Sequence, residues 1–107
     1  MAEAIPVIRP QGRLDGITSR EFEQDLLDRI ESGDRVLVLD FSKIEFISSA
    51  GLRAILSAAK RIKAAGGRLA ICSPKKQVKE IFDVTGCMTL LDIFPTYDAA
   101  AAHLTMK

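Results

Sequence analysis

Short apolar runs separated by polar stretches divide the chain into four predicted β-strands. Two of these runs are apolar on consecutive positions, which is typical of strands covered on both faces. The first run contains Pro6 and is followed by Pro10, and because proline cannot donate to a strand ladder we expect this strand at a sheet edge. The predicted strands cover residues 5–9, 36–39, 69–72 and 90–94, and residues 46–47 continue inward after a short polar loop.

The first predicted helix follows a predicted loop at residues 12–16. Thr18 or Ser19 can cap it. The better-spaced capping box pairs Thr18 with Glu21, because an acid three residues on can reach back to the N–H of the cap. The sequence Ser-Gly-Asp at 32–34 ends the helix. Its apolar positions follow helical spacing: Phe22, Leu26, Leu27 and Ile30.

Three more helices are predicted further along the chain. The second and longest begins at the boundary 48–49 and is stopped by the glycines at 66–67. The third has Pro74 in its first turn and ends at Gly86, and the fourth covers about 98–104. The apolar stripes are Leu52, Ile55, Leu56, Ala59 and Ile62 in the second helix and Val78, Ile81 and Phe82 in the third.

Strands and helices alternate from one end of the chain to the other. Such alternation is typical of a mostly parallel sheet with helices packed on it. We therefore predict one α/β domain over residues 1–107, with a mostly parallel (mixed) sheet of about four strands and about four helices packed on it.

The composition fits a small globular domain. Of the 107 residues, 48% are hydrophobic and 27% charged, which suffices for one buried core. The 15 basic and 14 acidic residues nearly cancel, so the chain has no basic footprint for direct nucleic-acid binding. The chain start does not read as a signal peptide, and no apolar run approaches the ~20 residues that span a bilayer. We expect a cytoplasmic protein without membrane insertion.

Catalytic motifs are missing from the sequence. Neither a phosphate-binding loop nor a GxSxG elbow occurs, and His103 is the only histidine, expected as a solvated side chain. Cys72 and Cys87 lack the spacing of a redox pair or a zinc site and read as two buried thiols. Asp40 ends a strand, but the acidic cluster of a phospho-aspartate receiver is absent. We expect no enzyme activity, no metal and no cofactor.

Two serines stand where a predicted strand meets the longest predicted helix. The first N–H groups of a helix have no partner within it, and a serine hydroxyl placed there can accept one of their hydrogen bonds. Such a cap stabilises a helix by about 0.5–2 kcal/mol. A structural cap is therefore sufficient by itself to explain Ser48 and Ser49.

The wider segment resembles the signature of STAS domains, and in particular of the bacterial anti-sigma factor antagonists. Segment 40–53 matches in its aspartate-led strand end, its aromatic–aliphatic pair, its two small polar residues and the Gly-Leu that opens a helix. Residues 12–15 resemble the family's Gly-x-Leu/Ile-Asp turn, 64–69 its helix exit and following strand, and 78–86 its third helix. The resemblance extends over nearly the whole chain and implies a STAS-like fold.

The resemblance also implies a partner switch. In this family the antagonist binds an anti-sigma factor that is itself a serine kinase, and this frees the sigma factor. The kinase phosphorylates a serine of the antagonist, which ends binding, and a separate serine phosphatase reverses the modification. By position the acceptor is Ser49, and Asp15 matches an acidic turn residue near the acceptor. The implied partner-binding residues are Asp15, Ser48, Ser49, Ala50, Gly51 and Arg53.

Two positions depart from the family pattern. Ser48 replaces an aspartate that commonly precedes the acceptor, and Ala50 replaces a serine or threonine that often follows it. Ser48 is therefore an alternative acceptor. We also expect the family's first strand to be shortened or absent here, since little precedes Ile5, which would leave the sheet one strand short and expose an edge.

The polar side of the second helix is a candidate contact surface. Arg53, Lys60 and Arg61 line it in our prediction, and an ordinary solvated face explains each of them equally well. The residues expected between them are Ala54, Ser57 and Ala58.

Two other functions remain open from the sequence. A STAS-type cytoplasmic subunit of a lipid or anion transport system would have the same fold and is the main alternative. An enzyme or nucleotide hydrolase is a third reading, for which no catalytic set can be assembled from the sequence.

Overall fold

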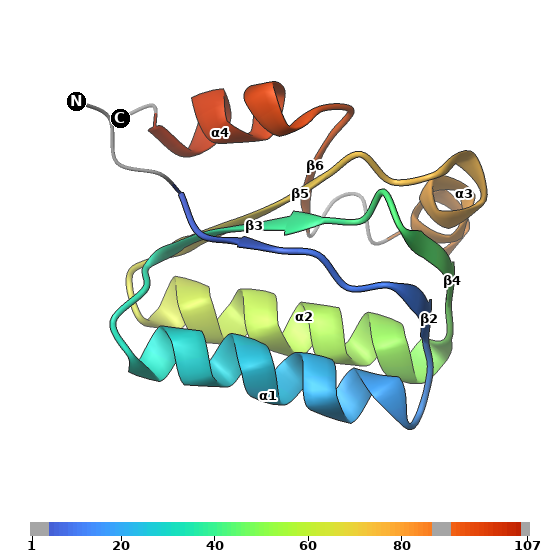
Figure 1. Cartoon of the computed structure of the whole chain (residues 1–107), viewed down its shortest axis with the longest axis horizontal. Helices are drawn as coiled ribbons and strands as arrows, with labels where there is room; N and C mark the ends of the chain where they lie inside the picture. Colours follow the sequence, from blue (N-terminus) through green and yellow to red (C-terminus); the bar gives the residue numbers. More distant parts are fainter. Residues whose placement is uncertain (1–4, 87–90, 106–107) are drawn as a thin grey trace.

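The computed structural model describes residues 5–86 and 91–105, and its main sheet has four strands in the order β1-β3-β5-β6. Every pairing in it is parallel (Figure 1). The strands are β1 Val7–Ile8, β3 Val36–Asp40, β5 Arg68–Cys72 and β6 Asp92–Phe94. The helices are α1 Thr18–Glu31, α2 Ser49–Ala64, α3 Lys76–Thr85 and α4 Tyr97–Thr105. The prediction of a mostly parallel sheet of about four strands with about four helices is confirmed for the main sheet, in which no pairing is antiparallel among the described residues.

Helices cover both faces of the sheet, with α1 and α2 on one side and α4 on the other (Figure 1). Successive side chains of a strand point to opposite faces. Accordingly, Leu37 and Leu39 of β3 join the core beneath α1 and α2, while Val38 between them packs with residues of α4. All three are fully buried, which confirms that β3 is a central strand covered on both sides.

The N-terminal strand β1 lies at the edge of the sheet beside β3, as its prolines indicate. Its ladder is only two residues long because Pro6 cannot donate, although the Pro6 carbonyl accepts from the N–H of Val38 at 3.0 Å. The other edge strand, β6, begins at Asp92. The predicted strand start at 90, together with Cys87, lies outside the described residues.

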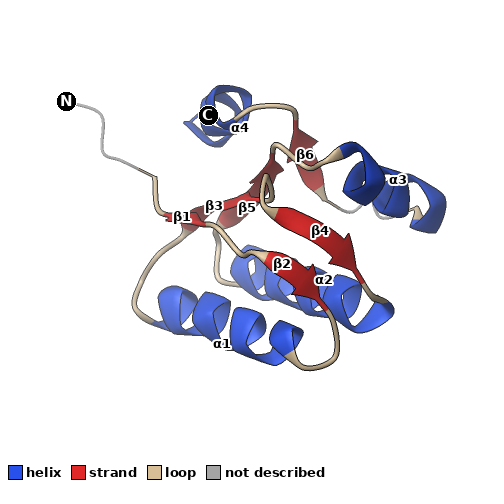
Figure 2. Ribbon diagram, turned by 45° about the vertical axis from the view of Figure 1, so that its right-hand side comes forward, coloured by secondary structure: helices blue, strands red, loops and turns tan. Residues whose placement is uncertain are grey.

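A second, two-stranded ladder joins β2 Gly12–Leu14 to β4 Ile44–Ile47, to one side of the main sheet (Figure 2). The prediction of a loop at 12–16 is therefore wrong for its first half. The strand has three residues, of which only Leu14 is buried, so its sequence shows no alternating pattern. Pairing with β4, which is distant in sequence, decides the conformation.

The first helix is capped differently from the prediction. The capping box of Thr18 and Glu21 does not form, because α1 begins at Thr18 itself. The N-cap residue is Ile17, whose side chain makes no capping hydrogen bond. Instead, the Asp15 carboxylate accepts from the N–H groups of Ile17 and Thr18. Pro74 is likewise outside the first turn of α3, which begins at Lys76.

The other helix ends agree with the sequence. Helix α1 ends just before Ser32, and Gly66, with φ of +83°, follows α2. Gly86 ends α3 in the left-handed conformation that glycine adopts most easily. Among the described residues no helix is long and apolar enough to cross a membrane.

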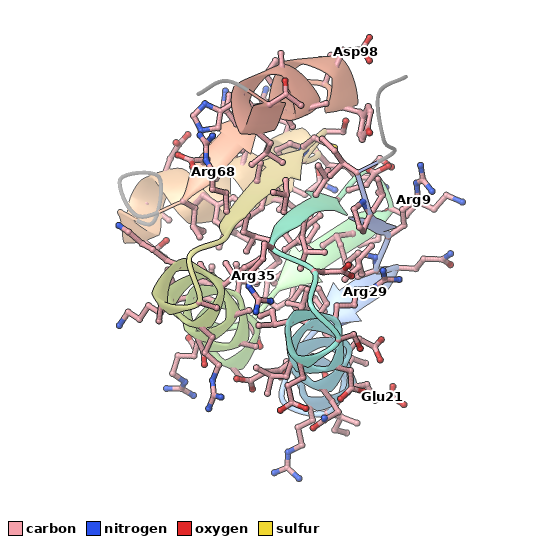
Figure 3. All side chains as sticks on the ribbon, turned by 90° about the vertical axis from the view of Figure 1, so that its left-hand side faces the viewer. Arg9, Glu21, Arg29, Arg35, Arg68 and Asp98 are labelled. Atoms are coloured by element: carbon pink, nitrogen blue, oxygen red, sulfur yellow. The ribbon has the colours of Figure 1, made fainter. Side chains whose placement is uncertain are left out.

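His103 is not the solvated side chain that its position on the last helix suggested. It is half-buried, with its Nε2 atom 2.9 Å from an Arg68 nitrogen and 3.3 Å from an Asp92 oxygen. Its ring lies 4.9 Å from that of Phe94. The last turn of α4 therefore docks on β5 and β6, and Figure 3 shows Arg68 on this side of the sheet.

Candidate functional site

The site lies where β4 passes into α2. Ser48 takes an extended conformation before the helix, and its side-chain oxygen accepts from the N–H of Gly51 at 3.2 Å. The Ser48 backbone carbonyl also accepts from Leu52. Because of these two hydrogen bonds, the half-buried Ser48 serves as the structural cap that the sequence indicates.

Ser49 is the first residue of α2 and is exposed. Its hydroxyl has no hydrogen-bond partner among the described residues, in contrast to that of Ser48. The unsatisfied N–H groups of the first turn give this end of the helix a partial positive charge. An open hydroxyl therefore lies in a setting that favours an added negative charge.

The end of β2 is fixed against this turn. The carbonyl oxygen of Leu14 accepts from the N–H of Ser48 at 2.8 Å. Gly51 allows the close approach, because a Cβ at this position would lie 2.6 Å from that same oxygen. Asp15, the next residue, is consequently held beside the start of α2. The structure thus brings together the two segments in which Asp15 and Ser49 were predicted as site residues.

The Asp15 side chain is held rigidly. Its Oδ1 atom accepts from the N–H groups of Thr18 at 3.1 Å and Ile17 at 3.0 Å, and from the Thr18 hydroxyl at 3.2 Å. These bonds from Thr18 and Ile17, with a smaller contribution from the charge of Arg13, hold the pKa of Asp15 below its ordinary value. The site therefore includes a fixed negative charge at neutral pH.

Two exposed residues near the site, Phe46 and Ile17, were not predicted as site residues from the sequence. Phe46 was expected to point inward, but it is 38% exposed, and the Arg13 guanidinium lies 4.6 Å from the centre of its ring. The local pattern gives no sign of this, because burial along β4 does not alternate: Ile44 and Ile47 are buried, and the two residues between them are exposed. Ile17, the residue just before α1, is 82% exposed and adds a second apolar side chain to the surface near Asp15.

The outer side of α2 continues from this end. Arg53, Lys60 and Arg61 are exposed, as predicted, and none has an ion-pair partner in the part of the chain that the structure describes. Ala54 and Ala58, expected between them, are buried instead. The reason is that α2 packs against α1 as well as against the sheet, which widens its buried face.

The site therefore combines an exposed hydroxyl, a helix N-terminus, a fixed carboxylate and unpaired arginines. Within residues 5–86 and 91–105, no cluster of three His, Cys, Asp or Glu side chains could hold a metal ion. The lone histidine contacts Arg68, Asp92 and Phe94 and is engaged away from Ser49. The arrangement suits a surface that a second protein docks on and modifies.

Comparison with known protein families gives a match to the STAS domain over residues 2–100. BtrV of Bordetella bronchiseptica, named as an anti-sigma factor antagonist, is 34% identical over 92 residues, which are 86% of this chain and 79% of the relative. The anti-sigma F factor antagonist of Paenibacillus polymyxa is 31% identical over 100 residues, 92% of this chain and 83% of the relative.

Solved structures share the fold. A Thermotoga maritima protein described as an anti-sigma factor antagonist superposes with a TM-score of 0.87 at 24% identity, covering 94% of this chain and 86% of that one. Bacillus SpoIIAA in its phosphorylated form superposes with a TM-score of 0.69 at 21% identity, covering 91% and 87%. These two likenesses concern the fold alone.

Proposed function

Because this chain belongs to the STAS domain family, we propose that it acts as an anti-sigma factor antagonist in a cytoplasmic partner-switching system. In the proposal the unphosphorylated form binds an anti-sigma factor that is also a serine kinase, and the sigma factor is released. Phosphorylation of Ser49 ends this binding, and a serine phosphatase restores it. Both relatives reported above are named anti-sigma factor antagonists, which favours this function over a transport subunit.

The observation that carries the proposal is the exposed, unpartnered Ser49 hydroxyl at the start of α2. It also distinguishes the two candidate acceptors. The Ser48 oxygen accepts from Gly51, so modifying Ser48 would remove the helix cap. Ser49 can be modified without breaking a hydrogen bond among the described residues.

A phosphate on Ser49 is expected to weaken docking without unfolding the domain. It adds about −1.5 to −2 charges. The helix N-terminus stabilises such a charge by about 0.3–1 kcal/mol. Burying the phosphate in an interface without compensating partners would cost several kcal/mol. About 2.7 kcal/mol already corresponds to a hundredfold change in affinity, so the interface penalty outweighs the internal gain.

The proposed contact surface surrounds the acceptor. It comprises the predicted residues Asp15, Ser48, Ser49, Ala50, Gly51 and Arg53, and we include Phe46 and Ile17 because their side chains are exposed. Aromatic residues and arginine are enriched at protein–protein interfaces, and Phe46 lies beside Arg13 here. Within this predicted set Gly51 is buried in α2, so we assign it the role of positioning Ser48 and Leu14 and not that of touching a partner.

Incubation with candidate anti-sigma factor kinases and ATP, followed by mass mapping, tests the acceptor. We expect phosphate on Ser49, and also on Ser49 of a Ser48→Ala variant, whose only defect should be a cap loss of about 0.5–2 kcal/mol. Ser49→Ala should bind the anti-sigma factor like the unmodified protein, and Ser49→Asp should bind at least about tenfold more weakly. Modification of Ser42 or Ser57 instead, or equal affinity of Ser49→Asp, would refute the switch.

A further inference from the structure

Two arginines lie on the two elements that meet at Ser49. Arg13 lies on β2 opposite Phe46 of β4, with its guanidinium over the Phe46 ring. The carbonyl of the next residue, Leu14, accepts a hydrogen bond from the N–H of Ser48. The backbone of Arg13 is therefore close to the turn that presents Ser49. The positive charge of Arg13 also makes a small contribution to the lowered pKa of Asp15.

The second arginine is Arg53 on α2. It stands four positions after Ser49, and residues at this spacing are neighbours on a helix surface. Helical side chains also lean toward the N-terminus, which directs Arg53 back over the first turn. Arg53 is exposed, and neither it nor Arg13 has a carboxylate within 4.0 Å among the described residues.

We propose that Arg13 and Arg53 form an intramolecular clamp for a phosphate on Ser49, an inference that rests on the proposed phosphorylation. Guanidinium groups bind phosphate through paired, charge-assisted hydrogen bonds, which are stronger than the stacking of an exposed arginine on an aromatic ring. Arg13 therefore leaves Phe46 when Ser49 is modified. In this proposal the phosphate would lie among the two arginines, the N–H groups of the first turn of α2 and the Asp15 carboxylate, which would repel it.

The clamp would change the docking surface in a second way, beyond adding charge. In the unmodified protein both guanidinium groups are available to a partner, and Arg13 covers one side of the Phe46 ring. In the modified protein both cations are engaged by the phosphate, and the ring loses its cover. The partner thus loses two cationic contacts and meets a different apolar surface.

Phosphorus NMR on protein with phosphoserine installed at position 49 by codon suppression tests the clamp. Pairing with a cation lowers the pKa of an acid, so removing either partner should raise the second pKa of the phosphate. We expect Arg13→Gln and Arg53→Gln each to raise it by about 1, the low end of the range for an acid beside an arginine. The matched control is Arg61→Gln, which removes an exposed arginine from a distant turn of the same helix and should leave the phosphate pKa unchanged.

A second measurement keeps the test independent of stability. The ring resonances of Phe46 should shift on phosphorylation clearly more in the parent protein than in Arg13→Gln, where no guanidinium can leave the ring. A phosphate pKa that responds no more to Arg13→Gln or to Arg53→Gln than to Arg61→Gln would overturn the clamp. Because the phosphoserine is installed without a kinase, this test does not depend on enzymatic phosphorylation. If no kinase modified Ser49, the proposed function would be refuted, but the NMR result on the clamp would still hold.

Discussion

Among single residues, Gly51 decides how closely β2 can approach the start of α2. A Cβ added here would lie 2.6 Å from the Leu14 oxygen and 3.0 Å from a methyl carbon of Ile47. Alanine is otherwise favoured over glycine inside a helix by about 1 kcal/mol. The contact is with backbone, and it is the same oxygen that binds the N–H of Ser48, so relief of the clash would loosen the site.

We therefore expect Gly51→Ala to lower the free energy of unfolding by about 1–3 kcal/mol despite its better helix propensity. Urea titration followed by circular dichroism measures this. Gly16→Ala is the matched control, because no atom lies within 4 Å of a Cβ at Gly16, and it should change stability by less than about 0.5 kcal/mol. Equal stability of the two variants would show that β2 and α2 are not in tight contact.

Sequence reasoning located the serines but not their surroundings. Helix-start chemistry and the family resemblance together singled out Ser48 and Ser49, because both signals are local in sequence. Arg13 and Phe46 were missed because their contact is made by pairing between β2 and β4. Asp15 was predicted from the resemblance alone, and its capping bonds to α1 appear only once the turn is built.

Among the elements, α3 depends on very few side chains for its docking. Only Val78 and Phe82 of this helix are fully buried, and the Phe82 ring stacks on Phe41 at 6.3 Å and 15°. Phe41 follows β3 directly and also packs against Phe22 of α1. Phe82 therefore connects α3 to the core that α1 and α2 share with the sheet.

Phe82→Ala should consequently cost about 3–5 kcal/mol of unfolding free energy, the range for truncating a buried phenylalanine. Val84→Ala is the control on the same helix, since Val84 is 83% exposed and its truncation should stay within about 0.5 kcal/mol. Chemical denaturation of both variants gives the comparison. Similar small losses would mean that α3 is not anchored through Phe82.

The elements that were predicted correctly have a clear hydrophobic pattern in their own sequence, and the strand that was missed does not. Strand β3 was predicted as central because its side chains are apolar on consecutive positions, and burial on both faces requires this. Helix α2 was predicted from its long apolar stripe. Strand β2 has three residues with one buried side chain, so nothing in its own sequence distinguishes it from a loop.

In the molecule as a whole, the two faces of the sheet carry unequal layers. The core beneath α1 and α2 contains large side chains from both helices and from α3, including Leu26, Ile55 and Phe82. The opposite core is smaller, and α4 contributes only Ala100 and Leu104 to it. Segments with few buried contacts open at lower free energy than the rest of a protein, so α4 should undock before the domain unfolds.

Cys72 reports on this opening. It is fully buried in the smaller core, and burial raises the pKa of its thiol, so it reacts only when α4 moves away. In a Cys87→Ser background we expect labelling of Cys72 by a thiol reagent to depend little on low urea concentrations, because undocking exposes little surface. Leu104→Ala should speed labelling by at least about tenfold, since truncating a buried leucine costs about 2–5 kcal/mol.

Phe82→Ala supplies the contrast, because it weakens the larger core and leaves the contacts of α4 in place. It should lower global stability and change the labelling rate of Cys72 in the absence of urea far less than Leu104→Ala does. If labelling instead followed global unfolding in both variants, with the full urea dependence of that transition, the two layers would open together. The result matters for the proposed switch, because α1, α2 and the strand ends that present Ser49 belong to the layer expected to stay closed.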